Sequence, residues 1–272
     1  MAKAVSFLLA LILLGLGISC QIPQEEKEIL PRVSAVFPSS DTLPENLLRM
    51  YLHFSKPMKP IGNLEKIALF DEDDQEIVGA IFNNVHELWD RNQQQLTLIF
   101  DPSRVKTGLI AHKEMGRSLQ MGKNYKLVIG QLEDVEGNKL KEVYTKTFYA
   151  SKEDTLPPNT KHWIVKTPKA GSHSPLIVQF PAMLDRQALL HRLQLTDKNS
   201  QPISGEVVIT KQETEWRFES TEKWPAGDYI LYVHGRLEDP CGNNLNGLFD
   251  HKKGSLKNNR EGAVETIEFR IE

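Results

Sequence analysis

The stretch LEDVEGNKL at residues 132–140 recurs as LEDPCGNNL at residues 237–245. Both read Leu-Glu-Asp, two free positions, Gly-Asn, one free position and Leu. The Asp side chain can accept hydrogen bonds from backbone amides one or two residues further on, and the Gly permits the positive φ of a tight turn. We interpret each stretch as a turn after a strand that ends at Leu132 or Leu237. Two copies of the turn predict two copies of one β-module.

The duplication extends well beyond these nonapeptides. Residues 52–54 match residues 178–180 at an offset of 126, because 178 minus 52 is 126, and the same offset relates 67–71 to 193–197. Such a constant offset is the mark of an internal repeat. Tyr125 and Tyr229 are only 104 apart, so the first copy carries roughly twenty extra residues, which the alignment assigns to an insertion at 103–121.

Apolar residues alternate with polar ones in both copies. This period of two, with one apolar face, is typical of antiparallel strands that cover a core. Turn residues at 71–75 and 197–202 predict hairpin loops, and 184–193 predicts one or two helical turns. The fold class is therefore all-β, with two tandem β-sandwiches. The alternating sets are Met50/Leu52/Phe54, Leu96/Leu98/Phe100, Tyr125/Leu127/Ile129, Leu176/Val178/Phe180, Tyr229/Leu231/Val233 and Ile267/Phe269/Ile271.

The chain begins as a secreted protein does. Lys3 precedes an apolar run over 4–16, which is too short and too close to the start for a membrane span and predicts a signal peptide at 1–19. Gly17-Ile18-Ser19-Cys20 resembles a bacterial lipobox, although Gly17 stands where Leu is usual. We expect Cys20 to become the lipidated first residue; the alternative is an ordinary signal peptide that ends near a Cys.

The two cysteines bear on the same question. If Cys20 carries lipid, Cys241 has no partner for an internal disulfide, whereas without lipid a Cys20–Cys241 bridge is the alternative. The Pro pair within 151–161 predicts an extended linker. The predicted order is a signal peptide, a tether at 20–30, domain 1 at 31–150 with the insertion 103–121, the linker 151–161 and domain 2 at 162–272.

Three segments then resemble a known family. Residues 31–38 (PRVSAVFP), 52–58 (LHFSKPM) and the Leu-Glu-Asp-x-x-Gly-Asn turn resemble the SbsA-type bacterial Ig-like domain of surface-layer proteins. The second copy departs from the pattern, because Phe180-Pro-Ala-Met183 lacks the Ser. The resemblance implies immunoglobulin-like antiparallel β-sandwiches in a non-catalytic, extracytoplasmic module that spaces, stiffens or adheres. It supplies no catalytic residue.

Chemistry-bearing motifs are sparse. The sequence contains no nucleophile elbow, no metalloprotease helix motif and no phosphate-binding Gly loop, so we expect no enzyme and no cofactor. The acidic loop 71–74 could gather oxygens around Ca²⁺, but it lacks the Gly and the distant Glu of a dedicated loop, and a solvated hairpin is the better interpretation. We therefore predict no metal. With 33 basic and 36 acidic side chains, no nucleic-acid partner is expected.

Binding residues are predicted near the insertion, because long loops on a rigid scaffold often carry them. The candidates are Trp89, Arg104, His112 and Arg117. The alternative is a surface flap that covers an open edge or packs on the neighbouring domain. Trp216 and Trp224 are expected in or at the rim of their own core. The basic segment 246–262 reads as a solvated connection or as a contact for acidic headgroups or polymers.

The sequence predicts a lipid-anchored cell-envelope protein of a bacterium with a structural or protein-interaction role. Its expected partners are a membrane, through the anchor at Cys20, and an envelope protein or polysaccharide. Gln21 favours the outer membrane, at its periplasmic face or at the cell surface, in a host that uses Asp at this position for inner-membrane retention. The alternative function is a glycan-binding accessory lipoprotein that uses the domain 1 insertion.

Overall fold

The computed structural model describes residues 30–83, 86–251 and 263–272. The predicted signal peptide, Cys20 and all of the tether but Leu30 lie outside the described residues, as does 252–262 of the basic segment. In the part of the chain that is described, no helix has the length and apolar character needed to cross a membrane.

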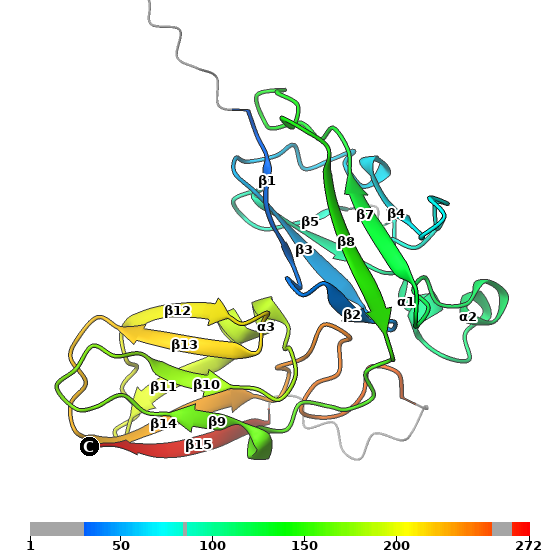
Figure 1. Ribbon diagram of the computed structural model, residues 1–272. Coiled ribbons are helices and arrows are strands. Elements are labelled where there is room, and N and C mark those ends of the chain that lie inside the picture. Colours follow the sequence, from blue (N-terminus) through cyan, green and yellow to red (C-terminus); the bar gives the residue numbers. More distant parts are fainter. Residues whose placement is uncertain (1–29, 84–85, 252–262) are drawn as a thin grey trace, which may run out of the picture.

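The first half of the chain forms one sandwich (Figure 1). Its elements are β1 (Val33–Phe37), β2 (Thr42–Pro44), β3 (Arg49–Phe54), the 3-10 turn η1 (Leu64–Lys66), β4 (Ile67–Phe70), β5 (Leu88–Trp89), β6 (Gln95–Ile99), α1 (Pro102–Val105), α2 (Ile110–Met115), β7 (Asn124–Ile129) and β8 (Tyr144–Ser151).

The second half forms the other sandwich. Its elements are η2 (Thr160–His162), β9 (Ile164–Lys166), β10 (Leu176–Gln179), α3 (Arg186–His191), β11 (Leu193–Asp197), β12 (Gly205–Thr210), β13 (Glu215–Ser220), β14 (Gly227–His234) and β15 (Val264–Ile271).

In the first sandwich, the sheet β1-β3-β6-β5 packs against the sheet β2-β8-β7-β4. Met50, Leu52, Leu96 and Leu127, from strands of both sheets, are completely buried in the core between them. Every strand pair is antiparallel except β2–β8, which is parallel, so the antiparallel expectation fails at this one short strand. Apart from that pair, the predicted sandwich is confirmed.

In the second sandwich, the sheet β12-β13-β10-β9 packs against β11-β14-β15, and all pairs are antiparallel. Leu176 and Val178 of β10 are completely buried opposite Leu231 of β14. Trp216 and Trp224 are 1% exposed and lie within this core, as predicted. The described chain is thus all-β with two immunoglobulin-like sandwiches, and α3 supplies the short helix expected within 184–193.

The repeated turn has the same geometry in both copies. The Oδ1 atom of Asp134 accepts hydrogen bonds from the amides of Glu136 and Asn138, at 3.0 and 2.8 Å. In the second copy Oδ1 of Asp239 accepts from Cys241 and Asn243, at 2.8 and 3.0 Å. Gly137 and Gly242 have φ values of 91° and 82°, which side-chain-bearing residues rarely adopt. The predicted hydrogen bond to the amide two residues on and the positive φ of the Gly are therefore confirmed, and a second bond to the amide four residues on adds to them.

The hairpins that repeat at offset 126 also match. Asp71 accepts from the amides of residues 73 and 75, and Asp197 accepts from those of residues 199 and 201. The ends of two strands differ from the prediction. The strands before the nonapeptides end at Ile129 and His234, three residues before the predicted Leu132 and Leu237, which are buried caps of the core instead.

Candidate functional site

The two sandwiches meet at a joint formed by β3 on one side and by α3 with the repeated turn on the other (Figure 1). Strand alternation directs Tyr51 away from its own core, yet this side chain is only 5% exposed. Its hydroxyl donates a hydrogen bond of 2.6 Å to Oδ2 of Asp185. Asp185 is the N-cap of α3, and its Oδ1 accepts from the amide of Ala188 at 2.8 Å. One carboxylate thus both caps a helix and joins two domains.

An ion pair lies beside this hydrogen bond. Arg49 donates to Oε1 of Glu238 over 2.6 Å, and the two side chains are 24% and 22% exposed. Burial raises the pKa of Asp185, of Glu238 and of the Tyr51 hydroxyl, because it penalises the charged form of each group. Separation of the sandwiches would leave Asp185 without its donor, so these contacts favour one arrangement of the two domains.

The second copy of the nonapeptide lies inside the joint. The carbonyl of Pro240 accepts a hydrogen bond from the amide of Leu48 at 3.0 Å. The Cys241 thiol is 1% exposed and donates to Oδ1 of Asn46 at 3.3 Å. Burial raises the pKa of this thiol well above its usual value, so Cys241 is held as an unreactive thiol.

The first copy of the same turn faces solvent. Val135 and Glu136 occupy the positions of Pro240 and Cys241, because 240 minus 135 and 241 minus 136 are both 105. Val135 is 53% exposed, and the Glu136 side chain is 63% exposed and pairs with Lys56. The two free positions of the nonapeptide therefore distinguish a solvent-facing turn from an interface turn.

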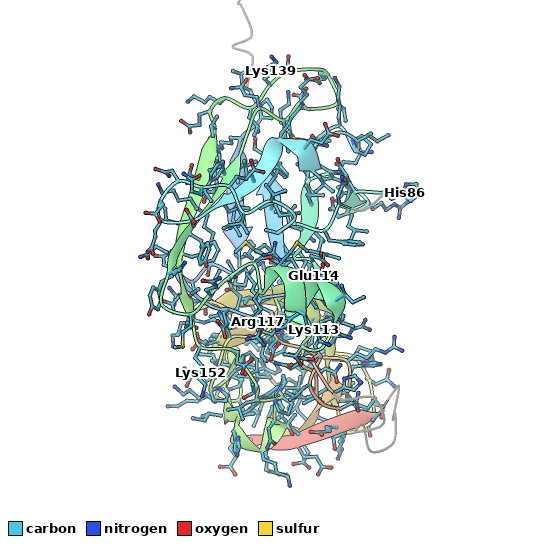
Figure 2. All side chains as sticks on the ribbon, turned by 90° about the vertical axis from the view of Figure 1, so that its right-hand side faces the viewer. His86, Lys113, Glu114, Arg117, Lys139 and Lys152 are labelled. Carbon is cyan, nitrogen blue, oxygen red and sulfur yellow. The ribbon has the colours of Figure 1, made fainter. Side chains whose placement is uncertain are left out.

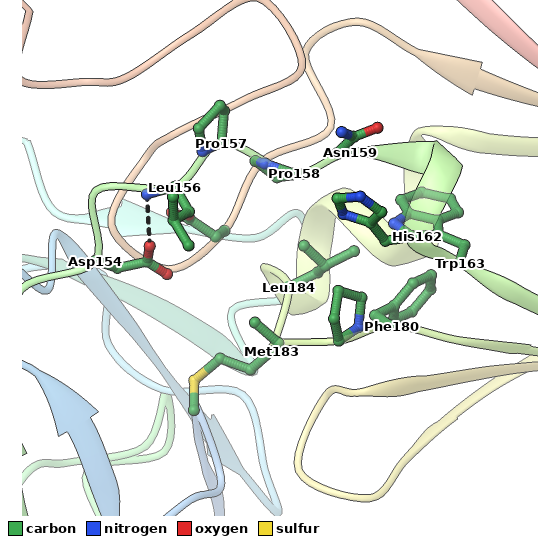
Figure 3. A pocket seen from close by; sticks show the side chains of 13 residues that line it. Asp154, Leu156, Pro157, Pro158, Asn159, His162, Trp163, Phe180, Met183 and Leu184 are labelled. Atoms are coloured by element: carbon green, nitrogen blue, oxygen red, sulfur yellow. Dashed lines mark hydrogen bonds between the residues drawn. The ribbon is translucent and has the colours of Figure 1, made fainter.

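A groove opens beside the joint, where the linker passes over the second sandwich (Figure 3). It encloses about 290 Å³. The rings of Trp163 and Phe180 meet edge to face, with centroids 4.7 Å apart, on one side of the groove. Leu156 of the linker lies on the other side and is 76% exposed. An apolar, concave surface of this kind is suited to binding a ligand.

The predicted insertion residues lie at the joint end of the first sandwich. The Arg104 guanidinium is buried and donates to the carbonyls of Gly116, Val78 and Arg117 at 2.9, 3.1 and 3.4 Å. Nδ1 of His112 lies 2.7 Å from the carbonyl oxygen of Arg104. These side chains hold the insertion together, and the binding role assigned to them stays a prediction.

Arg117 is paired rather than free. Its guanidinium contacts Glu45 at 2.8 Å and Glu153 at 2.5 Å, so it ties the insertion to the start of the linker. Figure 2 shows it beside α2, near Lys113 and Glu114. The insertion also contacts the second sandwich, because the amide of Thr107 donates to Asp250 at 3.1 Å. Packing on the neighbouring domain was the alternative that the sequence left open.

Trp89 is not brought together with these residues. It pairs with Leu96 at one end of β6, whereas the insertion follows Phe100 beyond the other end, roughly 13 Å away along the strand. Its indole is half-buried against Phe54, with centroids 5.5 Å apart, and donates to Glu87 at 2.9 Å. In the described ranges, no three His, Cys, Asp or Glu side chains gather as a metal would need.

The joint and groove residues were not identified from the sequence. Tyr51 carried a signal, since an aromatic residue at an outward strand position calls for a covering surface. The helix-capping role of Asp185 could also be predicted from the sequence, because an Asp directly before a short helical segment is a typical N-cap. Arg49 and Trp163 gave no signal of their own, and Glu238 was visible only as part of the repeated turn, because only the folded arrangement brings these residues to the joint and the groove.

No family model and no curated protein matches the sequence. Domains 1–6 of surface layer protein SbsC match at 11% identity and a TM-score of 0.32, covering 90% of this chain and 41% of that one, so the chain spans less than half of that structure. A chimeric titin Z1Z2 matches at 13% identity and 0.27, covering 89% and 97%. Alpha-2-macroglobulin of Escherichia coli, domains MG0-NIE-MG1, matches at 11% and 0.29, covering 90% and 72%.

Proposed function

We propose that this chain is a lipid-anchored cell-envelope protein of a bacterium, in which two Ig-like modules form a spacer or interaction arm of fixed shape. The observation that carries the proposal is the joint, where the Tyr51–Asp185 hydrogen bond and the Arg49–Glu238 ion pair link the two sandwiches. A freely hinged pair of domains would not bury a helix cap and an aromatic hydroxyl together at their contact. The role is structural and non-catalytic.

The repeated motif supports membership in the SbsA-type Ig-like family as part of the same proposal. Phe54 and Met58 of the Phe-Ser-x-x-Met segment are buried, and Met58 forms a bridge to Asp134 of the nonapeptide. In the second copy Leu184 stands opposite Met58 at offset 126 and is likewise buried. Met183, the residue before Leu184, packs against the core of the first sandwich.

Attachment to the envelope rests on the sequence around Cys20. In a bacterial host, the full chain should sediment with membranes and take up labelled palmitate, whereas Cys20→Ala should be soluble and unlabelled. Cys241→Ala is the matched control, because the other cysteine is buried and should leave sedimentation unchanged. Equal membrane association of the wild type and Cys20→Ala would contradict the anchor.

The fixed shape has its own test. Small-angle scattering of residues 21–272 should fit a single arrangement of the two sandwiches. The double variant Arg49→Ala/Tyr51→Phe should show a larger radius of gyration and a broader distance distribution, because the two side-chain contacts that β3 makes with the second sandwich are lost. Indistinguishable scattering of the two proteins would contradict the proposed role of the joint.

A further inference from the structure

We propose that the groove beside the linker binds a lysine or arginine side chain with apolar neighbours, presented by an extended segment of a partner protein. The inference deepens the proposed interaction role and rests on it. Three features of the described residues carry it: the apolar walls, the two carboxylates at one end, and the small volume.

The walls suit the stem of a long side chain. Trp163 and Phe180 present the aromatic side, and Pro157 and Leu156 of the linker present the opposite side (Figure 3). Lysine and arginine bury their methylene stems along such surfaces while their charged ends reach a polar partner. An indole close to the path of a cation adds a favourable cation–π contact. The apolar wall therefore recognises the stem, and the neighbouring leucine at the rim can contact a flanking apolar residue.

The charge lies at the end of the groove nearest the joint. Asp154 of the linker and Asp239 of the nonapeptide turn both line it. The side-chain amide of Asn243 donates to Oδ2 of Asp239 at 2.9 Å and to the carbonyl of Asp154 at 3.2 Å, which places the two residues side by side. Within the described residues, neither carboxylate forms an ion pair with a Lys, Arg or His side chain.

Two adjacent carboxylates without a counter-ion repel each other. Burial, and after it the charge of Asp154, raises the pKa of Asp239 to about 7. The other titratable groups nearby are Glu238 and Cys241 of the same turn and His162 in the groove wall. Arg117 acts on Cys241 but is committed to two other carboxylates. A bound ammonium or guanidinium would supply the missing positive charge.

The volume of the groove limits the size of the ligand. A volume of about 290 Å³ lies at the lower end of the range for ligand sites, so the groove accommodates one long side chain with part of its neighbours. Anionic or neutral apolar ligands would leave the paired carboxylates uncompensated. The chemistry thus points to a cationic residue within an otherwise apolar segment.

The test uses residues 21–272 and three short peptides that differ at one position. Calorimetry should show acetyl-Leu-Lys-Leu-amide binding at least about tenfold more tightly at pH 8 than its norleucine and glutamate analogues. The lysine peptide should bind about tenfold more weakly at pH 6, where Asp239 is mostly protonated, and the norleucine peptide should show no such dependence. The fluorescence of Trp163 should change on binding.

Variants that replace Asp by the isosteric Asn test whether the two carboxylates cause the preference for lysine over norleucine. Asp239→Asn and, separately, Asp154→Asn should each reduce the advantage of lysine over norleucine by several-fold, because the charge is lost while an amide oxygen can still accept from the backbone amides that the carboxylate binds. Asp239→Asn also removes the acceptor of the Asn243 side-chain amide. Asp154→Asn remains informative if Asp239→Asn fails to fold. Asp228→Asn is the control, since Asp228 is an exposed residue paired with Arg270 away from the groove, and should leave the lysine advantage unchanged.

The inference is overturned if the lysine and norleucine peptides bind equally, if no peptide binds at about 1 mM, or if Asp154→Asn keeps the full advantage. None of these outcomes depends on membrane attachment or on scattering. A protein that sediments with membranes and keeps its shape but shows no lysine preference would therefore contradict this inference alone.

Discussion

Tyr51 and Asp185, which are 134 residues apart in the chain, are joined by a 2.6 Å hydrogen bond that crosses from one sandwich to the other. Both side chains are buried, at 5% and 2% exposed. The strand that carries the tyrosine was predictable, whereas the surface that covers it was not. The energetic weight of this contact can be measured directly.

Tyr51→Phe should lower the free energy of unfolding by about 1–3 kcal/mol, because it leaves a buried carboxylate oxygen without its donor. Urea denaturation followed by fluorescence measures the change. Tyr149→Phe is the control: Tyr149 is 41% exposed on β8, and its loss should change stability by less than about 0.5 kcal/mol. Similar values for the two variants would show that the cross-joint hydrogen bond contributes nothing.

The two repeated glycines offer a matched pair. Gly242→Ala places a methyl group 2.7 Å from Cδ2 of Leu48 across the joint, in addition to the strain of a φ of +82°. Gly137→Ala carries the same strain at +91° but meets nothing closer than Lys59 at 3.9 Å. Gly137→Ala should cost about 1 kcal/mol and Gly242→Ala about 1–3 kcal/mol more, measured by denaturation. Equal losses of unfolding free energy in the two variants would mean that Leu48 can move away from the added methyl group without destabilising the protein.

Stability should depend on pH through Asp239. The folded protein holds this proton up to about pH 7, whereas an unfolded Asp releases it near pH 3.8. The folded state therefore binds more protons between these values, and the stabilising contribution falls as the pH rises from about 4 to about 7. Between pH 5 and pH 8 the wild type should lose about 2–3 kcal/mol more than Asp239→Asn does.

Other groups set the controls for that measurement. Burial raises the pKa of Asp185 and of Glu238 too, so their slopes have the same sign and persist in Asp239→Asn. Glu215 acts in the opposite direction. Although burial opposes it, hydrogen bonds from Lys211, Gln179 and Arg217 lower its pKa to about 2, so its contribution is lost only as the pH falls below about 4.5. Parallel curves for wild type and Asp239→Asn would contradict the assignment.

The insertion should depend on Arg104. Arg104→Met removes three hydrogen bonds to backbone carbonyls and should open residues 103–121 locally, so that trypsin cleaves at Lys106 or Lys113 at least about tenfold faster. Arg91→Met changes an exposed arginine on the same sandwich and should leave the cleavage rate at these lysines unchanged. An unchanged rate in Arg104→Met would show that other contacts hold the insertion.

The fold was predictable because local rules agreed with it. Met50, Leu52 and Phe54 alternate and are buried, and the Asp and Gly of each nonapeptide perform the turn chemistry that their positions predicted. The candidate site was not predictable, because it is made where two surfaces meet. Alternation correctly directs Tyr51 outward, and no property of one strand tells whether water or another domain lies there.

The insertion illustrates the same limit. Arg104 and Arg117 are predicted binding residues because they lie in a long loop on a rigid scaffold, and that role stays a prediction. In the structure Arg104 donates hydrogen bonds to backbone carbonyls, and Arg117 forms ion pairs with Glu45 and Glu153. Charge in a loop does not reveal its partner until the fold brings the partner near.

Because Val135-Glu136 and Pro240-Cys241 differ, the two modules cannot exchange places in the chain and still form the same joint. A protein with the two halves exchanged would carry the same cores and the same turns. It would, however, present a charged glutamate where the present chain buries a thiol against Asn46. Two identical copies of the module could stand in either order. The residues at these turn positions make the two modules different and give the pair a defined N-terminal and C-terminal member.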